Sequence, residues 1–535
     1  MKTEKNSHGE NATLYSTHIL MLPVIFNRSI GDVNRAAAES GWNYRPFRLN
    51  EHHENYNEYI YFYEHVRKVL YTKENMASAG AASSCYFETP QQRGTFSFKM
   101  ADTKDPESRE VTETGKTYHL DIVGLSLRTF TTQVGILSIE LENHAYGDPE
   151  DVLVINDFAR RLYPQFLSPK SDKEDGLQEV KGALLPEWVE MKLGQIEERE
   201  DFIYYADYSN LEEDITHLPA YVDALFGERF SSRESAAEET IHVEPIIDDR
   251  MFLISLYMND DLSEAMKQYD APGARYAYET FCAQTQDGEA TDPSVCRAGS
   301  FWYEFLFVDG RGRTCQSRHL CPKLVRNATY DRWVEWGTLF GMSRYSFVAL
   351  TGSEYGSKRL EPHMRTLYFQ MFTLLLAYRA SLLHFSNRVS GLRIRKRRQK
   401  GLEQEVQRIY GDYIHFQNNL LFREVTAQEQ GIELFAMGYR MMGIDKQVKD
   451  LDSEIAELHN YLRMIQDEEE NAKLGKLNIL AGLLLPVSVL SGIAGMNILP
   501  PSWETWGKTH IGWFALGTLA VTGAILWWIS EEKNQ

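Results

Sequence analysis

The sequence has little of what marks a secreted, disulfide-bonded or nucleic-acid-binding protein. Its five cysteines are an odd number at irregular spacing with no CxxC pair, which argues against a disulfide framework. Four of them fall between 282 and 321, but free buried thiols are favoured over a zinc site. No signal peptide is recognisable, so we expect the bulk of the chain in the cytosol. A net charge of −20 excludes a general nucleic-acid binder, which would need a basic face.

The sequence also shows no recognisable catalytic constellation, so we expect that the protein is not an enzyme. The pairs Asp248-Asp249 and Asp260-Asp261 could bind a cation, but solvated turns are the favoured interpretation. The stretch DGRGR at 309–313 is typical of a hairpin turn and not of a phosphate-binding loop, because no helical pattern begins after it.

Charge is absent from two stretches near the C-terminus, although the mean hydropathy of the whole chain is only −0.41. Residues 477–500 would form a helix of about 36 Å, and residues 511–529 one of about 28 Å, at a rise of about 1.5 Å per residue. The short link at 501–510 predicts an antiparallel transmembrane hairpin. We therefore expect a multi-pass protein of the inner membrane, with the N-terminal domain and the C-terminus in the cytosol. Another apolar run, 371–383, is too short and is expected to be a buried core helix.

Upstream of the first uncharged stretch, apolar residues repeat in alternating steps of four and three. They are Ile444, Val448, Leu451, Ile455, Leu458, Leu462 and Ile465. Such a heptad seam is either a core stripe that packs on its own chain or a stalk that packs on copies of itself. No proline occurs between Pro362 and Pro486, so the helix can run unbroken toward the first stretch, and self-association is favoured.

A second series at similar spacing is rich in small and polar residues. It comprises Asn471, Leu474, Asn478, Ala481, Leu485, Ser488, Gly492 and Gly495. Polar groups are unfavourable in hydrocarbon unless a partner or water meets them, so this stripe is expected to face protein or water. Small residues on such a helix usually indicate tight helix packing, which is the alternative interpretation.

The tripeptide Gly495-Met496-Asn497, at the end of the first uncharged stretch, resembles the GMN motif of the CorA family of magnesium channels. The ordered residues before it are also similar to the family's pattern. These are Asn471, Leu474, Leu477, Ala481, Leu485, Pro486, Ser488 and Gly492. The similarity covers about residues 400 to 535.

This resemblance implies a homopentamer that passes divalent cations, with Mg²⁺ as the expected ion. The stripe residues and Leu477 would line the pore, Gly495, Met496 and Asn497 would form the selectivity filter, and Asn497 would hold the hydrated ion by outer-sphere hydrogen bonds. The chemistry suits that role, because neutral amide oxygens can bind hydrated Mg²⁺ without trapping it. The resemblance also makes Leu474, Leu477 and Leu485 candidates for hydrophobic constrictions of the pore.

The large N-terminal part has a pattern typical of an α/β domain, a mixed sheet flanked by helices. Predicted strands are 18–26, 95–100, 117–127, 134–141, 251–258, 301–308 and 346–350, and predicted loops are 101–116, 169–178 and 231–245. The expected organisation is a flexible N-terminus (1–17), an α/β domain (18–361), a helical hairpin (362–443), a stalk and pore helix (444–500, spanning at 477–500), an outer loop (501–510), a second span (511–529) and a tail (530–535).

This cytosolic domain is much longer than the one that the CorA resemblance implies. Certain enlarged CorA-like proteins are encoded beside type III CRISPR systems and are opened by a nucleotide second messenger, so an antiviral role with a nucleotide ligand is one expectation. The alternative is a membrane-anchored nucleotide-binding or hydrolysing protein whose hairpin serves only as an anchor.

A basic run lies between two helical patterns. It consists of Arg393, Arg395, Lys396, Arg397, Arg398 and Lys400. If residues 402–437 form one helix that packs antiparallel to the stalk, this run lies at the inner membrane surface and can bind anionic lipid headgroups of the bilayer. A solvated basic turn is the alternative.

Overall fold

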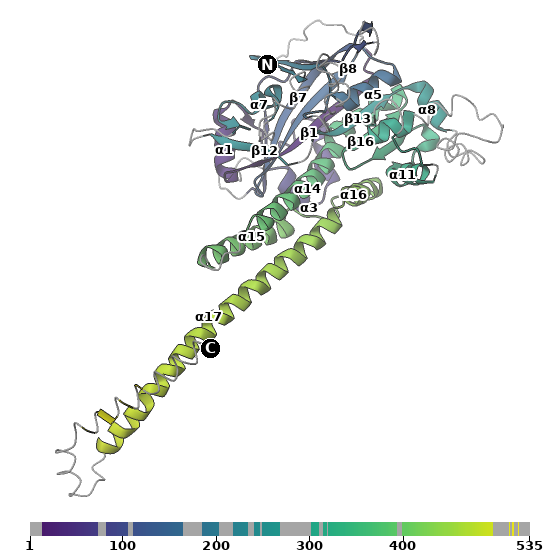
Figure 1. Ribbon diagram of the computed structural model, residues 1–535. Helices are drawn as coiled ribbons and strands as arrows, with labels where there is room; N and C mark the ends of the chain where they lie inside the picture. Colours follow the sequence, from purple (N-terminus) through teal and green to yellow (C-terminus); the bar gives the residue numbers. More distant parts are fainter. Residues whose placement is uncertain are drawn as a thin grey trace. The chain divides into compact units, whose positions relative to one another are not determined.

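The computed structural model describes most of the chain as two units, residues 1–452 and 453–535 (Figure 1). The described residues are 13–72, 82–104, 111–163, 185–202, 218–233, 240–246, 249–267, 301–309, 314–317, 319–392, 399–495 and isolated positions between 513 and 523.

A 14-stranded sheet runs through the first unit and carries its core. Along its main path the strands are β10 (Ile196–Asp201), β9 (Trp188–Leu193), β4 (Gly94–Lys99), β7 (Thr117–Phe130), β8 (Val134–Asn143), β1 (Ser16–Phe26), β13 (Phe252–Met258), β16 (Ser346–Thr351), β15 (Leu339–Met342) and β14 (Thr329–Tyr330). Off this path lie β2 (Asn43–Tyr44), β3 (Ser84–Glu88), β11 (Phe230–Ser231) and β12 (Ile241–Pro245). A separate ribbon pairs β5 (Thr103–Lys104) with β6 (Val111–Glu113).

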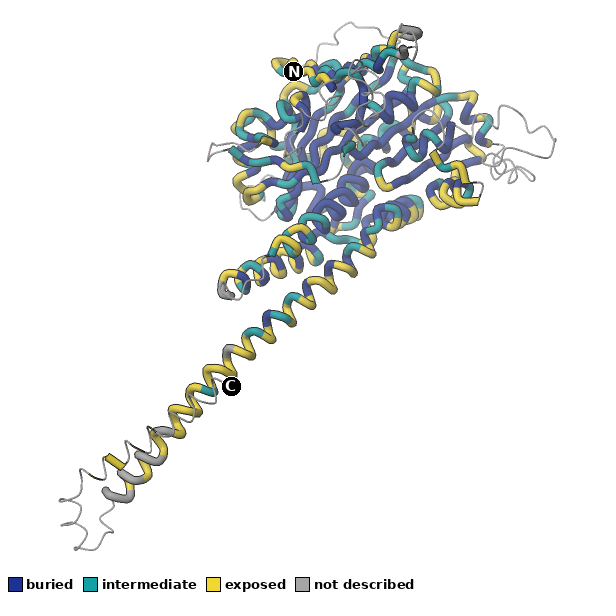
Figure 2. The backbone as a smooth tube through the Cα atoms, in the orientation of Figure 1, coloured by how far each residue is buried: buried dark blue, intermediate teal, exposed yellow. Residues whose placement is uncertain are grey.

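The sheet is mixed, as the sequence predicts. Neighbours along the path are antiparallel except β13 and β16, which run parallel, and β11 is also parallel to β12. Strand β1 is buried along nearly its whole length, because helices cover both faces of this part of the sheet (Figures 1 and 2). On one face the Phe372 ring of α14 (Phe369–Ser390) stacks on Phe252 of β13 and Phe347 of β16, with ring centroids 5.6 and 4.3 Å apart.

Several short helices of this unit flank the sheet. They are α1 (Ile30–Glu39), α2 (His53–Tyr61), α3 (Glu64–Leu70), α5 (Pro149–Phe158), α7 (Ala220–Phe226), α8 (Asp260–Lys267) and α11 (Leu320–Ala328). Helix α1 begins where the Ser29 hydroxyl accepts a hydrogen bond from the Asp32 amide, an ordinary N-cap.

One predicted strand is wrong, since residues 301–307 are helical. Aromatic residues there favour a strand by composition, but Phe301 and Phe305, one helical turn apart, stack at 5.1 Å between ring centroids. Trp302 is also buried, and the three rings join one apolar cluster against Tyr257 of β13. The predicted loop 101–116 contains β5 and β6, and 231–245 contains β12 and part of β11. The predicted loop 169–178 lies outside the described residues.

The predicted buried core helix at 371–383 is confirmed, because it lies within α14, whose residues from Phe369 to Leu382 are buried. The single helix expected at 402–437 is wrong. The chain instead forms α15 (Gln399–Asn419) and α16 (Glu429–Met441). The intervening segment packs into the fold, with the Phe422 amide donating to the Tyr378 hydroxyl at 3.2 Å. The expected position of the basic run required one helix over 402–437 that packs antiparallel to the stalk, and the structure does not contain that helix.

The long C-terminal helix α17 (Ile444–Gly495) is continuous for 52 residues, as the absence of proline before Pro486 predicts. It begins after Gly443, whose φ of +70° is a left-handed conformation that glycine adopts without strain. At about 1.5 Å per residue, α17 is about 78 Å long.

The predicted membrane segments are not supported. Within the described part of the chain, we find no helix whose length and apolar character would let it cross a bilayer. The first predicted span is described as far as Gly495, and the second at isolated positions. This finding contradicts the two-helix transmembrane hairpin and the multi-pass location in the inner membrane.

His18 lies at the centre of the sheet and makes the fold sensitive to acid. Its Nδ1 lies 2.7 Å from the Asn156 side-chain oxygen, and its Nε2 lies 2.9 Å from the Ser16 hydroxyl. Complete burial lowers the pKa of His18 to about 4 from an ordinary value of 6.5, against the opposing effect of the Asn156 hydrogen bond. The unfolded chain therefore takes up a proton as the pH falls below 6.5, whereas the folded chain resists it until about pH 4.

We expect the free energy of unfolding to fall by about 3 kcal/mol between pH 7 and pH 4 on account of this one side chain. In His18→Gln that contribution to the pH dependence should disappear, whatever the variant's stability at pH 7. Urea unfolding at several pH values measures how steeply the free energy of unfolding depends on pH in the wild type and in His18→Gln. His53→Gln, on an exposed position, is the matched control. Parallel slopes for wild type and His18→Gln would contradict the assignment.

Candidate functional site

The residues predicted to line an ion path lie on one helix and, by their spacing, on one side of it. Steps of three and four residues along α17 bring the series from Asn471 to Gly492 onto a common face. Every side chain of this series is exposed, and so is Leu477. Leu477 and Leu485 are among the most exposed, at 59% and 62%. The series is therefore available to a partner.

The polar side chains of this stripe differ in their hydrogen-bonding partners. The Ser488 hydroxyl donates to the Leu484 carbonyl at 2.8 Å, so it needs no outside partner. The amides of Asn471 and Asn478 are exposed. Gly495 is the last residue of α17, and Met496 and Asn497 lie outside the described residues.

The distal part of α17 also carries large apolar side chains of its own that are exposed. Exposed in this region are Leu474, Leu477, Ile479, Leu480, Leu484, Leu485 and Val489. Single exposed apolar residues are ordinary, but a contiguous set on one helix is typical of an interaction surface. Figure 2 shows this exposed stretch as yellow positions along α17.

The heptad seam begins in the core of its own chain. Its first three residues, Ile444, Val448 and Leu451, belong to the first unit and are buried there. The sequence favours self-association along the whole seam. At the start of the seam, however, this burial supports the alternative, a core stripe that packs on its own chain. Farther along, Ile455 and Leu462 are buried, whereas Leu458 and Ile465 are partly exposed.

The basic run lies almost entirely outside the described residues. Only Lys400 is placed, near the start of α15, and its side chain is not described. Its predicted position at an inner membrane surface depended on the helix 402–437 and on the membrane location, and both were wrong.

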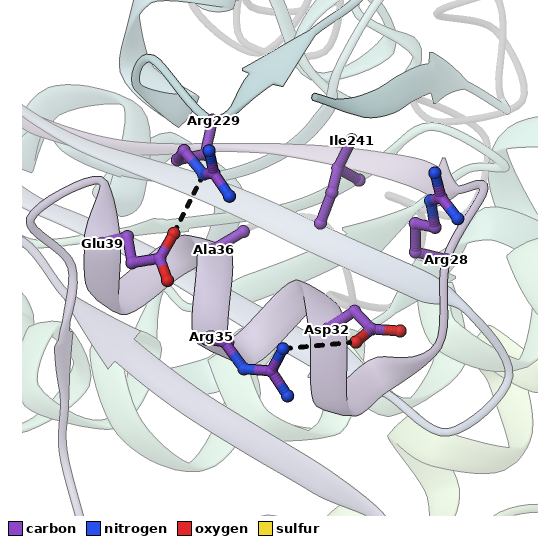
Figure 3. A pocket seen from close by; sticks show the side chains of 7 residues that line it. All are labelled: Arg28, Asp32, Arg35, Ala36, Glu39, Arg229 and Ile241. Carbon is purple, nitrogen blue, oxygen red and sulfur yellow. Dashed lines mark ion pairs between the residues drawn. The ribbon is translucent and has the colours of Figure 1, made fainter. Parts of the chain in front are cut away.

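A pocket that the sequence did not reveal opens beside α1 (Figure 3). Its volume is about 280 Å³, and it is lined by Arg28, Asp32, Arg35, Ala36, Glu39, Arg229 and Ile241. Arg229 pairs with Glu39 at 2.9 Å, and Arg35 approaches Asp32 at 3.8 Å. The lining has three arginines and two carboxylates, so it is weakly cationic, and its ion pairs are exposed enough to contribute little. The only sequence signal was Arg28 and Arg35 at a spacing of seven.

No metal site emerges from the residues that were candidates for one. In the described part of the chain, no three His, Cys, Asp or Glu side chains are placed to hold a metal ion. Among the described residues, Cys85, Cys315 and Cys321 are in no disulfide; Cys85 and Cys321 are buried, and Cys315 is partly exposed. Asp260 accepts hydrogen bonds from the amide and hydroxyl of Ser353, both at 2.7 Å, and these lower the pKa of its carboxyl group. Cys282 and Cys296 lie outside the described residues.

Comparisons with known proteins add no relative. No protein-family model matches the chain, and no curated protein or solved structure matches it either. The similarity to the CorA family therefore depends on the quoted residues alone.

Proposed function

We propose that this chain is the subunit of a CorA-like homopentamer that passes divalent cations, with Mg²⁺ as the expected ion, along a path enclosed by the α17 helices. The observation that carries the proposal is the distal half of α17, where a stripe of small and polar residues and many apolar side chains are exposed on one continuous helix. Copies of the same helix would cover the apolar side chains and turn the stripe toward a common axis.

The chemistry of the stripe suits a hydrated cation. Exposed amides at Asn471 and Asn478 can hydrogen-bond to the water shell of Mg²⁺, which the ion gives up reluctantly. Leu474, Leu477 and Leu485 would narrow the path with apolar side chains that exclude water when the helices close together. Asn497, just beyond α17, would supply the final ring of neutral amide oxygens, with Gly495 and Met496 completing the filter.

The sharpest test replaces Asn497. Asn497→Ala removes the amide, and Asn497→Asp exchanges the neutral ring for a charged one that binds the ion harder and releases it more slowly. We expect each to lower Mg²⁺ flux by about tenfold or more, since an amide that contacts the ion's water shell contributes on the order of 1.4 kcal/mol. Flux into liposomes that hold a Mg²⁺ indicator measures the effect.

Asn418→Ala, at an exposed position of α15, is the control and should leave the flux unchanged. Both Asn497 variants should retain the unfolding midpoint of the wild type in urea, because the first unit does not contain this residue. Wild-type protein without flux, or variants with unaltered flux and selectivity, would contradict the proposed function.

A further inference from the structure

Three arginines contact Tyr345 in the first unit, and a fourth, Arg161, is linked to this group by ion pairs with Asp157 and Asp249. Arg379 of α14 and Arg250, just before β13, stack over the Tyr345 ring, with guanidinium carbons 4.8 and 5.4 Å from its centroid. Arg160, which follows α5, donates to the Tyr345 carbonyl at 3.5 Å. Its neighbour Arg161 forms a β-bridge with Arg250. Segments far apart in sequence are thus gathered where the parallel strands β13 and β16 begin.

Only two carboxylates accompany these four cations in the described part of the chain. Asp157 lies 2.7 Å from Arg161 and 3.7 Å from Arg160. Asp249 lies 2.9 Å from Arg161 and 2.8 Å from Arg250. Both carboxylates are therefore already occupied by ion pairs, and the group retains an excess of two positive charges.

The excess charge is deeply placed and incompletely satisfied. Arg160 and Arg161 have only 1% and 3% of their side chains exposed, and Arg379 is buried too. Among the described residues, the Nε atoms of Arg160, Arg161 and Arg379 have no hydrogen-bond partner, although each is buried. Backbone carbonyls accept from some of the remaining nitrogens, as Val308 does from Arg160 at 3.2 Å and Arg344 from Arg379 at 3.1 Å.

Such an arrangement is costly without a counter-charge. Buried cations are stable when they are paired, and several kcal/mol are lost for an ion left alone. Burial lowers the pKa of Arg160 to about 9, the direction expected for a cation whose surroundings do not compensate its charge. Val308, whose carbonyl accepts from Arg160, has a φ of +52°, a strained conformation for a β-branched residue that the surrounding contacts must enforce.

We propose that the cluster of Arg160, Arg161, Arg250 and Arg379 binds a phosphate group, either inorganic phosphate or the phosphate of a small ester. Planar guanidinium groups with several N–H donors match the oxygens of a phosphate, which would supply the missing negative charge. Arg250 and Asp249 keep 18% and 14% of their side chains exposed, so the cluster reaches the protein surface at this edge. The assignment does not depend on the assembly proposed above.

The pocket beside α1 is the natural competitor, and it serves as an internal control. Its Arg35 side chain is 73% exposed, in contrast with the buried arginines around Tyr345. An anion held there would be surrounded by solvent and screened by salt.

The test is a titration of the full-length protein with inorganic phosphate at constant ionic strength, with chloride as the reference salt and the thermal unfolding midpoint as the readout. We expect a saturable rise with phosphate. Arg250→Gln should weaken the apparent affinity by about tenfold, the effect of one charge-assisted contact. Arg35→Gln should leave it within about twofold.

Asp249→Asn tests the charge argument in the opposite direction. It removes a carboxylate that competes for Arg161 and Arg250, so phosphate should bind about fivefold tighter or better and restore part of the stability that the variant loses. This result is informative even if Arg250→Gln does not fold.

Adenosine 5′-monophosphate in a parallel titration distinguishes the source of the phosphate. Tighter binding than inorganic phosphate indicates an ester, and weaker binding indicates the free ion. A phosphate response no different from chloride, weaker binding in Asp249→Asn, or a response lost in Arg35→Gln and kept in Arg250→Gln would overturn the assignment.

Discussion

Replacing Leu451 by aspartate is expected to destabilise the first unit by about 4 kcal/mol or more. Leu451 lies on α17 but belongs to the first unit, where only 2% of its surface is exposed. Truncation of a buried leucine to alanine costs about 2–5 kcal/mol, and a carboxylate adds the cost of a buried polar group or an unpaired charge. A loss of this size is comparable with the whole stability of an ordinary domain.

Urea unfolding followed by circular dichroism measures the change. The same substitution at Leu474, which is 55% exposed on the same helix, is the matched control. It should alter the free energy of unfolding of the first unit by less than about 0.5 kcal/mol. Equal stabilities for Leu451→Asp and wild type would mean that the start of the seam is not part of this core.

The second large effect is expected in the assembly. Leu477→Asp combined with Leu485→Asp places one carboxylate per chain on the exposed stripe and one beside it, so five copies would bring ten carboxylates together around one axis. Like charges and the burial of unpaired ions should weaken association by about a hundredfold or more. The first unit should keep its stability, because neither residue belongs to it.

Size-exclusion chromatography with light scattering measures this dissociation. Lys473→Asp, which inverts a charge on α17 away from the stripe, should leave the assembly intact. If the double variant and the wild type had the same mass at every concentration, the stripe would not face other subunits.

Much of the fold was accessible from local patterns. Strands β1, β7, β8 and β13 carry long apolar or alternating runs, and their period of two residues is a direct consequence of strand geometry. Aromatic residues were the weak point, since Phe301 to Phe307 satisfy either a strand or a helix until packing decides. The break between α15 and α16 contains neither glycine nor proline, and it depends on tertiary contacts such as that of Phe422 with Tyr378.

The candidate sites, too, differ in whether local sequence patterns predict them or tertiary contacts create them. The stripe on α17 follows from spacing alone, because all of its residues lie on one helix and need no tertiary contact to share a face. The direction in which the seam faces could not be deduced, since a core stripe and a coiled-coil seam have the same period. The arginine cluster had no usable signal. Arg160 and Arg379 are more than 200 residues apart, and only the order of the strands brings them to Tyr345.

The mass of the intact assembly tests the central claim most directly. Native mass spectrometry of the full-length wild-type protein, diluted to nanomolar concentration, should show a species of about 309 kDa, five times the mass of the 61.7 kDa chain. A protein that remains at the mass of a single chain, at concentrations up to those used for the flux measurements, would contradict the assembly and the cation path that depends on it.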